Sequence, residues 1–313
     1  MDTGLILNID KSLETVPCDL CGHNNDEFLY LKIGTLTGRQ FRVVRCRSCG
    51  LIYLNPRLNE LALAGLYDNK YYAGNGFDSV INYLADFEKD GDCEKMFRPE
   101  RTVEEIKELV PPPSMLLDFG CGLGDFMKQA IKHGYEAEGF EVSQFAAEFA
   151  RTNGLKVYTS LEDLPNEQYD IVTAIEVLEH CFSPMKALRA IYRCLKPGGC
   201  FYYTTTNFDG FYKRWRLGIR DVRDDYVKPE GHTYFFSSSV MKSYFKNIGF
   251  SKVFHFEPYI KEGRLFKLLL NSGFVKGPAN APAKFLDRFL YYGGRNILIT
   301  LRRQQRRLPL VRK

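Results

Sequence analysis

The chain has 313 residues, of which 45% are hydrophobic and 26% charged, as expected of a globular protein with room for one large domain and a small one. It contains no apolar run of about 18 residues and no N-terminal stretch with a basic start and a long apolar core, so we expect neither a transmembrane helix nor a secretory signal. The net charge of +5 comes from the last twelve residues, which carry six basic groups and no acid. The rest of the chain is close to neutral, which argues against nucleic acid as the main partner.

Two matching cysteine pairs stand near the N-terminus, Cys18-Asp-Leu-Cys21-Gly and Cys46-Arg-Ser-Cys49-Gly, with 24 residues between them. Four thiolates from two such turns can surround Zn²⁺ tetrahedrally, and because cysteine fills all four positions the metal is expected to be structural. The alternative, four unrelated cysteines, is disfavoured by the doubled spacing. Residues 1–58 are therefore predicted to form a zinc-ribbon domain, and the five other cysteines, scattered singly, favour a reducing, cytoplasmic location.

Residues 59–113 are predicted to form a helical linker. The stretch 59–67, NELALAGLY, has helical spacing, and Tyr72 follows it in a glycine-rich loop. Charged, helix-forming sequence then runs over Phe87–Leu109 with an interruption at a proline. The run Pro111–Pro113 ends any helix and marks the boundary with the next domain.

The stretch Leu116–Met127, LLDFGCGLGDFM, has an apolar run that ends at Asp118 and three glycines at alternate positions, Gly120, Gly122 and Gly124. Helical spacing resumes behind them, which predicts a buried strand, a tight turn and the beginning of a helix. Glycine suits such a turn because it allows positive φ and lets a ligand approach the backbone closely. The spacing is G-x-G-x-G, which differs from the G-x-G-x-x-G of dinucleotide-binding proteins.

A second short strand, AEGFE, ends at Glu141, which lies 21 residues after Gly120. In nucleotide-binding α/β sheets an acid at about that distance accepts hydrogen bonds from ribose hydroxyls. Further strand-like stretches alternate with helical ones, which predicts a mostly parallel α/β sheet. They are LKVYTS (155–160), YDIVTAIEVLEH (169–180), LKPGGCFYYTTTN (195–207), GFSKVFHF (249–256) and NILITL (296–301).

In this order the pieces resemble the class I S-adenosylmethionine-dependent methyltransferases. The matching parts are LLDFGCGLGDF, the acid Glu141, LEDLP near Leu161, YDIV…EVLEH and LKPGG, and the resemblance covers about Met115–Arg303. It implies an α/β, Rossmann-like methyltransferase domain over 114–313. Its seven-stranded sheet would have a reversed last strand, here NILITL, and the cofactor would lie over the carboxyl ends of the first four strands.

The resemblance also implies roles in binding S-adenosylmethionine. The three glycines would allow close approach, Glu141 would bind the ribose, and Asp118 would accept from the ammonium group. The alternative for Asp118 is an acid that caps the glycine turn. Ser160 and Leu161 would hold the adenine edge, and Glu176 would border the methionine end of the cofactor.

Three further residues have two interpretations each. In related enzymes a tyrosine placed like Tyr72 closes over the cofactor, whereas the alternative is packing between ribbon and sheet. His180, at the end of EVLEH, and His232, in PEGHTYFFS, are candidate general bases, because histidine titrates near neutral pH and a hydroxyl acceptor must lose a proton. The alternatives are a histidine at a helix start and a hydrogen-bonded loop histidine.

Two insertions are expected to decide the substrate. The insertion 208–231 holds the only tryptophan, Trp215, among aromatics and arginines, as a lid over an acceptor would. The insertion 262–294 contains amphipathic runs that would pack on the sheet or on a twin subunit in a homodimer, or form a groove for a lipid-like acceptor. For the basic tail, 302–313, we favour a solvated terminus over peripheral contact with an anionic membrane.

The sequence therefore predicts methyl transfer from S-adenosylmethionine to oxygen or carbon of a small-molecule acceptor, such as a sugar, a secondary metabolite or a quinone-like compound. EVLEH and LKPGG are especially similar to the ubiquinone-pathway O-methyltransferases, which lack the ribbon. One alternative is a ribosomal RNA base methyltransferase that uses the ribbon to bind RNA. Another is a non-catalytic protein whose ribbon holds a partner.

Overall fold

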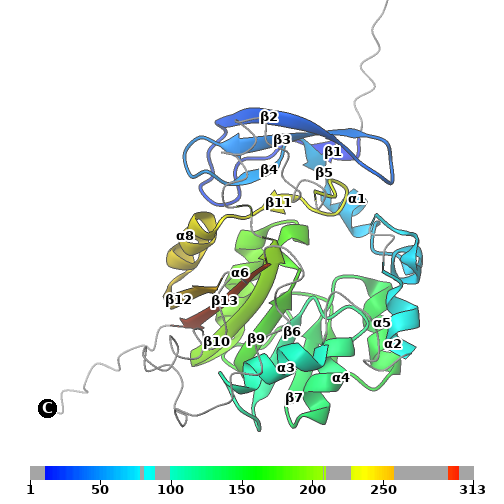
Figure 1. The fold of residues 1–313 in the computed structure, drawn as a ribbon, viewed down its shortest axis with the longest axis vertical. Coiled ribbons are helices and arrows are strands. Elements are labelled where there is room, and N and C mark those ends of the chain that lie inside the picture. The colour runs from blue at the N-terminus through cyan, green and yellow to red at the C-terminus, as the bar shows by residue number, and fades with distance from the viewer. Residues whose placement is uncertain are drawn as a thin grey trace, which may run out of the picture.

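A small zinc-ribbon-like unit stands over one end of a larger α/β layer (Figure 1). This computed structural model describes residues 11–77, 81–88, 99–206, 208, 227–256 and 295–302. The strands of the ribbon are β1 (Leu13–Glu14), β2 (Asp26–Ile33), β3 (Gln40–Cys46), β4 (Ile52–Leu54) and β5 (Arg57–Leu58). The hairpin of β2 and β3 carries the two cysteine turns at its base.

The main ribbon sheet includes a strand from much later in the chain. Its order is β11-β4-β3-β2, all antiparallel, and β11 (Tyr234–Phe235) pairs with β4 so that Tyr234 lies opposite Tyr53 and Phe235 opposite Ile52. In Figure 1 the yellow β11 runs between the blue ribbon and the green sheet. The ribbon sheet therefore extends beyond the 1–58 boundary expected from the sequence.

The segment between ribbon and main sheet is helical but not uniform. The structure corrects the expectation of a glycine-rich loop at Tyr72, because Tyr72 lies in a π-helical turn, which is kinked at Gly74 by its non-helical φ of 82°. The third helix packs through Val103 and Ile106 on the main sheet, so it belongs to the α/β layer. The elements are α1 (Glu60–Ala64), η1 (Tyr71–Asn75), α2 (Tyr83–Glu88) and α3 (Pro99–Lys107).

The main sheet has the strand order β12-β13-β10-β9-β6-β7-β8. The five strands from β10 to β8 are parallel, whereas β13 is antiparallel to both of its neighbours. This confirms the mostly parallel sheet and the reversed NILITL strand. The strands are β6 (Met115–Phe119), β7 (Glu136–Phe140), β8 (Val157–Tyr158), β9 (Tyr169–Ile175), β10 (Leu195–Thr206), β12 (Phe250–Phe256) and β13 (Arg295–Arg302).

Serine side chains define where three of the connecting helices begin. The hydroxyls of Ser143, Ser183 and Ser237 each accept a hydrogen bond from a backbone N–H of the first helical turn, which satisfies a donor that a helix start leaves open. The helices of the layer are α4 (Asp125–Lys132), α5 (Gln144–Thr152), the 3₁₀ turn η2 (Leu178–His180), α6 (Pro184–Cys194) and α8 (Ser238–Ile248).

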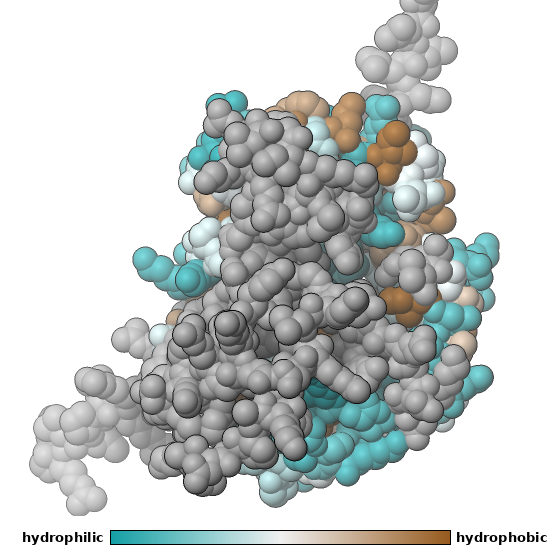
Figure 2. Space-filling view, in the orientation of Figure 1, coloured by the Kyte–Doolittle hydropathy of each residue, from teal (hydrophilic) through white to brown (hydrophobic). Residues whose placement is uncertain are grey.

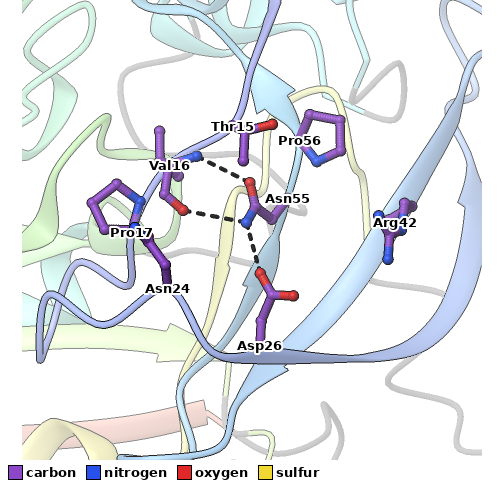
Figure 3. Close-up of a pocket in the computed structure, with 8 residues that line it drawn as sticks. All are labelled: Thr15, Val16, Pro17, Asn24, Asp26, Arg42, Asn55 and Pro56. Carbon is purple, nitrogen blue, oxygen red and sulfur yellow. Dashed lines mark hydrogen bonds between the residues drawn. The ribbon is translucent and has the colours of Figure 1, made fainter.

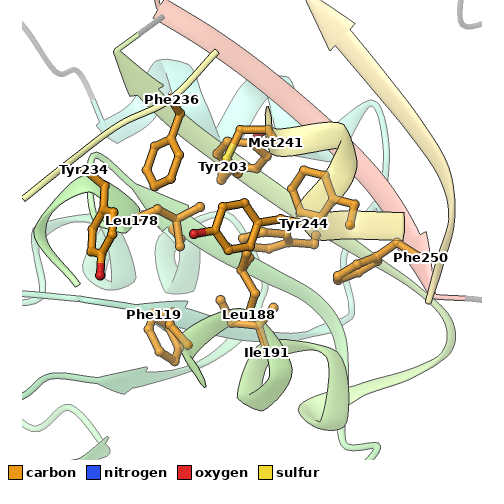
Figure 4. Close-up of a cluster of buried hydrophobic side chains, with 14 of the residues drawn as sticks. Phe119, Leu178, Leu188, Ile191, Tyr203, Tyr234, Phe236, Met241, Tyr244 and Phe250 are labelled. Carbon is orange, nitrogen blue, oxygen red and sulfur yellow. The ribbon is translucent and has the colours of Figure 1, made fainter. Parts of the chain in front are cut away.

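One hydrophobic core serves both the ribbon and the sheet. Figure 4 shows Tyr244 of α8, Phe236 of the β11 segment and Leu188 of α6 in one cluster of buried side chains. The same buried cluster continues into the ribbon through Leu20 and Tyr53. Separating the two units would expose this shared surface, so they are expected to behave as one folded body.

Several expectations concern parts of the chain outside the described residues. The insertion 208–231, with Trp215, is described only at 208 and 227–231, and neither 262–294 nor the tail after 302 is described. Within the described part, no helix is both long and apolar enough to cross a bilayer. On the face shown in Figure 2, hydrophobic residues gather over the ribbon. The exposed apolar side chains of the ribbon include Phe28, Leu31, Ile33 and Leu36.

Candidate functional site

The four cysteines of the ribbon converge on one point. Their Sγ atoms all lie within 4.8 Å of one another, with 3.4 Å between Cys18 and Cys49 and 3.5 Å between Cys21 and Cys46. Zinc bonded to four sulfurs at about 2.3 Å would hold them roughly 3.8 Å apart, so the thiol set fits a structural zinc ion. A hydrogen bond from Cys18 lowers the pKa of Cys49 to about 5, which provides a thiolate, the form that binds metal.

The glycine turn at the carboxyl end of β6 is tied to Glu141. The amide of Gly122 donates to one carboxylate oxygen of Glu141 at 2.9 Å, and the amide of Ser143 donates to the other at 2.8 Å. Gly120 adopts a φ of 81° and donates to the carbonyl of Phe140, which brings the turn onto the end of β7. These amide donors orient the carboxylate, whose oxygens are the acceptors that ribose hydroxyls require.

Asp118 lies beside Glu141 at the end of β6 and is buried. Its carboxylate accepts a hydrogen bond of 2.8 Å from the hydroxyl of Thr173 on the neighbouring strand β9. Burial raises the pKa of Asp118 to about 7, Thr173 opposes that rise, and the charge of Glu141 adds to it. A buried acid held at this pKa suits a cationic ligand group, because the ligand would favour the ionised form.

Aromatic residues cover the glycine turn. Tyr72 is buried, and its ring lies next to the open side of Gly122, where a Cβ would be only 4.0 Å from the ring. Tyr72 also packs edge-on against Tyr71 and beside Phe145. Tyr72 therefore packs among aromatic neighbours beside the turn, and its closing over the cofactor stays a prediction.

The two predicted histidines lie together. The ring centroids of His180 and His232 are 4.5 Å apart, and the Nδ1 atom of His180 lies 3.1 Å from the carbonyl of Gly231 and 3.0 Å from the hydroxyl of Tyr67. Burial, and to a smaller extent the neighbouring His232, hold the pKa of His180 well below its ordinary range, so the His180 imidazole is neutral near pH 7. Because a carbonyl only accepts, we assign the proton to Nδ1, which leaves Nε2 with a lone pair.

Tyr67 connects the histidines to the glycine turn. Its hydroxyl contacts His180, and its backbone carbonyl accepts a hydrogen bond of 2.7 Å from Ser143, the residue whose amide holds Glu141. Hydrogen bonds thus connect the acid, the glycine turn and the histidine pair. Sequence reasoning did not single out Tyr67 or Ser143. Ser143 could have been found from its position just before a helix. Nothing in the sequence pointed to Tyr67 except its aromatic neighbours.

The other predicted residues differ in how closely they approach this site. Glu176 follows β9 with a φ of 54°, a strained conformation that often marks functional positions. The hydroxyl of Ser160 turns toward Glu162 in its own loop, and Leu161 packs at the edge of the main core. The adenine contacts of Ser160 and Leu161 stay predictions.

The ribbon has a cavity of its own, far from the glycine turn in the chain and lined by polar groups. It measures about 360 Å³, and Figure 3 shows the side chain of Asn55 bridging the backbone of Val16 and the carboxylate of Asp26 across it. Because Asn55 bonds to these neighbours, its role is to join the N-terminal segment to the hairpin. The cavity contributes no group to the histidine site.

Comparison with known proteins agrees with this geometry. The sequence model of a family described as "Methyltransferase domain" matches residues 94–254, which is just over half of the chain. The ubiquinone biosynthesis O-methyltransferase of Aliivibrio fischeri is 31% identical over 102 residues, which are 29% of this chain and 44% of that protein. The enzyme of the same name from Hydrogenovibrio crunogenus is 30% identical over 156 residues, 46% of this chain and 64% of that protein.

The chain thus spans about half the length of the curated relatives it matches. Among solved structures, phosphoethanolamine N-methyltransferase 2 of Haemonchus contortus, in complex with S-adenosylmethionine, superimposes with a TM-score of 0.52 at 16% identity, covering 81% of this chain and 63% of that one. That likeness is one of fold. With the family match and the sheet order described above, the chain belongs to the methyltransferase domain family, in its class I, S-adenosylmethionine-dependent branch.

Proposed function

We propose that this protein transfers the methyl group of S-adenosylmethionine to a hydroxyl of a small-molecule acceptor. The observation that carries the proposal is the linkage of Glu141, which is placed to hold a ribose, to a neutral His180 through Ser143 and Tyr67. One end of this site suits the cofactor, and the other suits an acceptor that must lose a proton.

When bound, S-adenosylmethionine supplies a methyl group already activated by its sulfonium charge. The protein's part is therefore to bind and orient. Glu141 would hold the ribose hydroxyls, and Asp118 would receive the ammonium group. Gly122 has a positive φ of 54°, and a Cβ there would meet nothing nearer than the Tyr72 ring at 4.0 Å, so this glycine would let a ligand approach the backbone.

His180 is the base in this proposal. With Nδ1 held by Gly231, the Nε2 atom presents its lone pair and can accept the acceptor's hydroxyl proton. Positioned proton transfer of this kind contributes typically about 10²–10⁴-fold to a rate. His232, whose ring packs against His180, would share in shaping the acceptor site.

The acceptor class is supported by the relatives. Both matched enzymes described above carry the name ubiquinone biosynthesis O-methyltransferase. A phenolic or enolic hydroxyl suits this site, because it is more acidic than a sugar hydroxyl and His180, whose pKa is lowered, is a weak base. We therefore place phenols and quinone precursors first among candidates, ahead of sugars and carbon acceptors.

The test uses the full-length, zinc-loaded protein and methyl-labelled S-adenosylmethionine. A panel of phenols, sugars and total RNA is offered as acceptors, and label is followed into each. We expect transfer to a phenolic acceptor and at least about a hundredfold loss of rate in His180→Gln. Calorimetric affinity for S-adenosylhomocysteine should stay within about twofold of the wild-type value, because Glu141 is untouched.

Label entering RNA alone would overturn the small-molecule assignment. Failure of the wild-type protein to bind S-adenosylhomocysteine would overturn the cofactor assignment itself. A His180→Gln enzyme with unchanged rate would remove this histidine as the base. His133→Gln is the matched control, since His133 contacts Glu104 and Lys107 away from the site.

A further inference from the structure

The segment from Glu230 to Phe235 lies between the ribbon and the histidine site and is bonded to both. On the ribbon side, the amide of Leu54 donates to the carbonyl of Thr233, and β11 pairs with β4. On the other side, the amide of Thr233 donates to the carbonyl of Glu179, and the carbonyl of Gly231 meets His180. A shift of the ribbon would therefore also displace the backbone that contacts His180.

Glu230 makes the most specific of these contacts. It is only 1% exposed, and its Oε1 atom accepts three hydrogen bonds from the tip of the β2–β3 hairpin. The donors are the amide of Leu36 at 2.9 Å and the amide and hydroxyl of Thr37 at 3.0 and 3.1 Å. Charge-assisted bonds of this kind are stronger than neutral ones and fix geometry.

The hairpin is shaped for this carboxylate. A Cβ at Gly34 would overlap the carboxylate of Glu230, so the chain must lack a side chain there. Gly34 does not have a positive φ, so its conformation alone would permit other residues. Close approach of the acid is the reason for glycine at this position.

The residue after Glu230 orients the base. Gly231 is itself buried under the ring of Phe77, and its amide closes a turn with the carbonyl of Lys228 at 2.9 Å. Its carbonyl accepts from Nδ1 of His180 at 3.1 Å. Glu230 on one side and Phe77 on the other therefore fix the orientation of the Gly231 carbonyl.

We propose that Glu230 is a positioning residue, through which the ribbon hairpin fixes the Gly231 carbonyl and so keeps His180 in the Nδ1–H tautomer. The ribbon is then a structural part of the catalytic site. This inference rests on the proposed role of His180 as the base, and it assigns Glu230 no contact with cofactor or acceptor. Its disruption should change the state of His180 without changing cofactor binding.

The experiment reads the tautomer directly. Full-length, zinc-loaded protein is labelled with ¹⁵N-histidine, and two-dimensional imidazole spectra are recorded near pH 8, with His180 assigned from its loss in His180→Gln. In the wild-type protein we expect His180 as the Nδ1–H form. In Glu230→Gln and Gly34→Ala we expect the Nε2–H form to reach roughly a third or more of the population.

Controls separate positioning from general destabilisation. Glu27→Gln removes a ribbon charge that pairs with Arg45. Gly65→Ala adds a Cβ that would lie at ordinary van der Waals distance from its neighbours. Both should leave the tautomer unchanged. Thr37→Val removes one of the three donors to Glu230 and is the milder variant if the other two do not fold. We expect it to give a smaller Nε2–H population.

A His180 that keeps a single Nδ1–H tautomer in every folded variant of this contact would overturn the proposal, even where melting temperatures fall. The result is independent of the activity test, because the tautomer is read in protein without cofactor or acceptor. Once an acceptor is known, the same variants should lower kcat at least tenfold and leave the KM for S-adenosylmethionine within about twofold.

Discussion

At the scale of single residues, Asp118 is a buried acid whose ionisation has a cost to the fold. Its carboxyl has one strong donor, Thr173, and a charged neighbour, Glu141, inside a covered site. Burial raises the pKa of Asp118 to about 7, well above the value near 4 of an unfolded chain. The group therefore favours the folded state below about pH 4 and loses that contribution as pH rises through 7.

We expect Asp118→Asn to stabilise the ligand-free protein near pH 8 by about 2 kcal/mol, because it removes a buried charge while Asn can still accept from Thr173. The difference should vanish near pH 4, where the wild-type acid is protonated. Denaturant unfolding at the two pH values measures this. The same variant should bind S-adenosylmethionine more weakly, and a difference in stability between variant and wild type that is the same at both pH values would contradict the raised pKa of Asp118.

Glu141 offers a second test at this scale. Glu141→Ala removes the acceptor for Gly122, Ser143 and the ribose, so we expect at least a tenfold loss of affinity for S-adenosylhomocysteine by calorimetry. Glu136→Ala, at the exposed start of the same strand, is the control. Unchanged affinity in Glu141→Ala would remove this residue from the site.

At the level of elements, the first cysteine turn holds the beginning of α6. Asp19, between Cys18 and Cys21, accepts from the hydroxyl of Ser183, and also from the amide of Met185 and the hydroxyl of Tyr244, both at 2.9 Å. An acid there satisfies open amides and complements the positive end of the helix. The first cysteine turn and the helix that follows His180 are thus one unit.

We expect Asp19→Asn to destabilise the whole protein by about 1–2 kcal/mol, because an amide has one accepting oxygen where three donors converge. Thermal unfolding measures the loss, and Asp163→Asn, on an exposed loop, should be neutral. The zinc content should stay near one per chain, because Asp19 is not a ligand. Loss of zinc in this variant would instead place Asp19 in the metal site.

At the scale of the whole molecule, the shared core predicts how the metal affects stability. Cys18 and Cys46 belong to the same buried cluster as Phe236 and Tyr244. Stripping zinc with a chelator under reducing conditions should therefore lower the melting temperature of the entire chain in one transition. Two separate transitions, or zinc content near zero in the purified protein, would contradict this.

The sequence predicted what local patterns encode. Glycine spacing at Gly120 and Gly122, the acid at Glu141 and the doubled cysteine pairs each report on a few neighbouring residues, and the structure brings each set together. It could not predict that Tyr234 would pair with Tyr53, because a two-residue strand has no periodicity to detect. The roles of Tyr67 and Glu230 depend on such long-range contacts, so they were also missed.

The passage of β11 into the ribbon has a consequence for synthesis of the chain. The cysteine turns are synthesised early, but the edge of β4 cannot pair with β11 until Tyr234 has been translated. During that interval Ile52 and Tyr53 present an open strand edge, a known template for aggregation. A nascent or truncated chain that stops short of Tyr234 is thus expected to depend on chaperones, and transplanting the ribbon alone into another protein would carry the same liability.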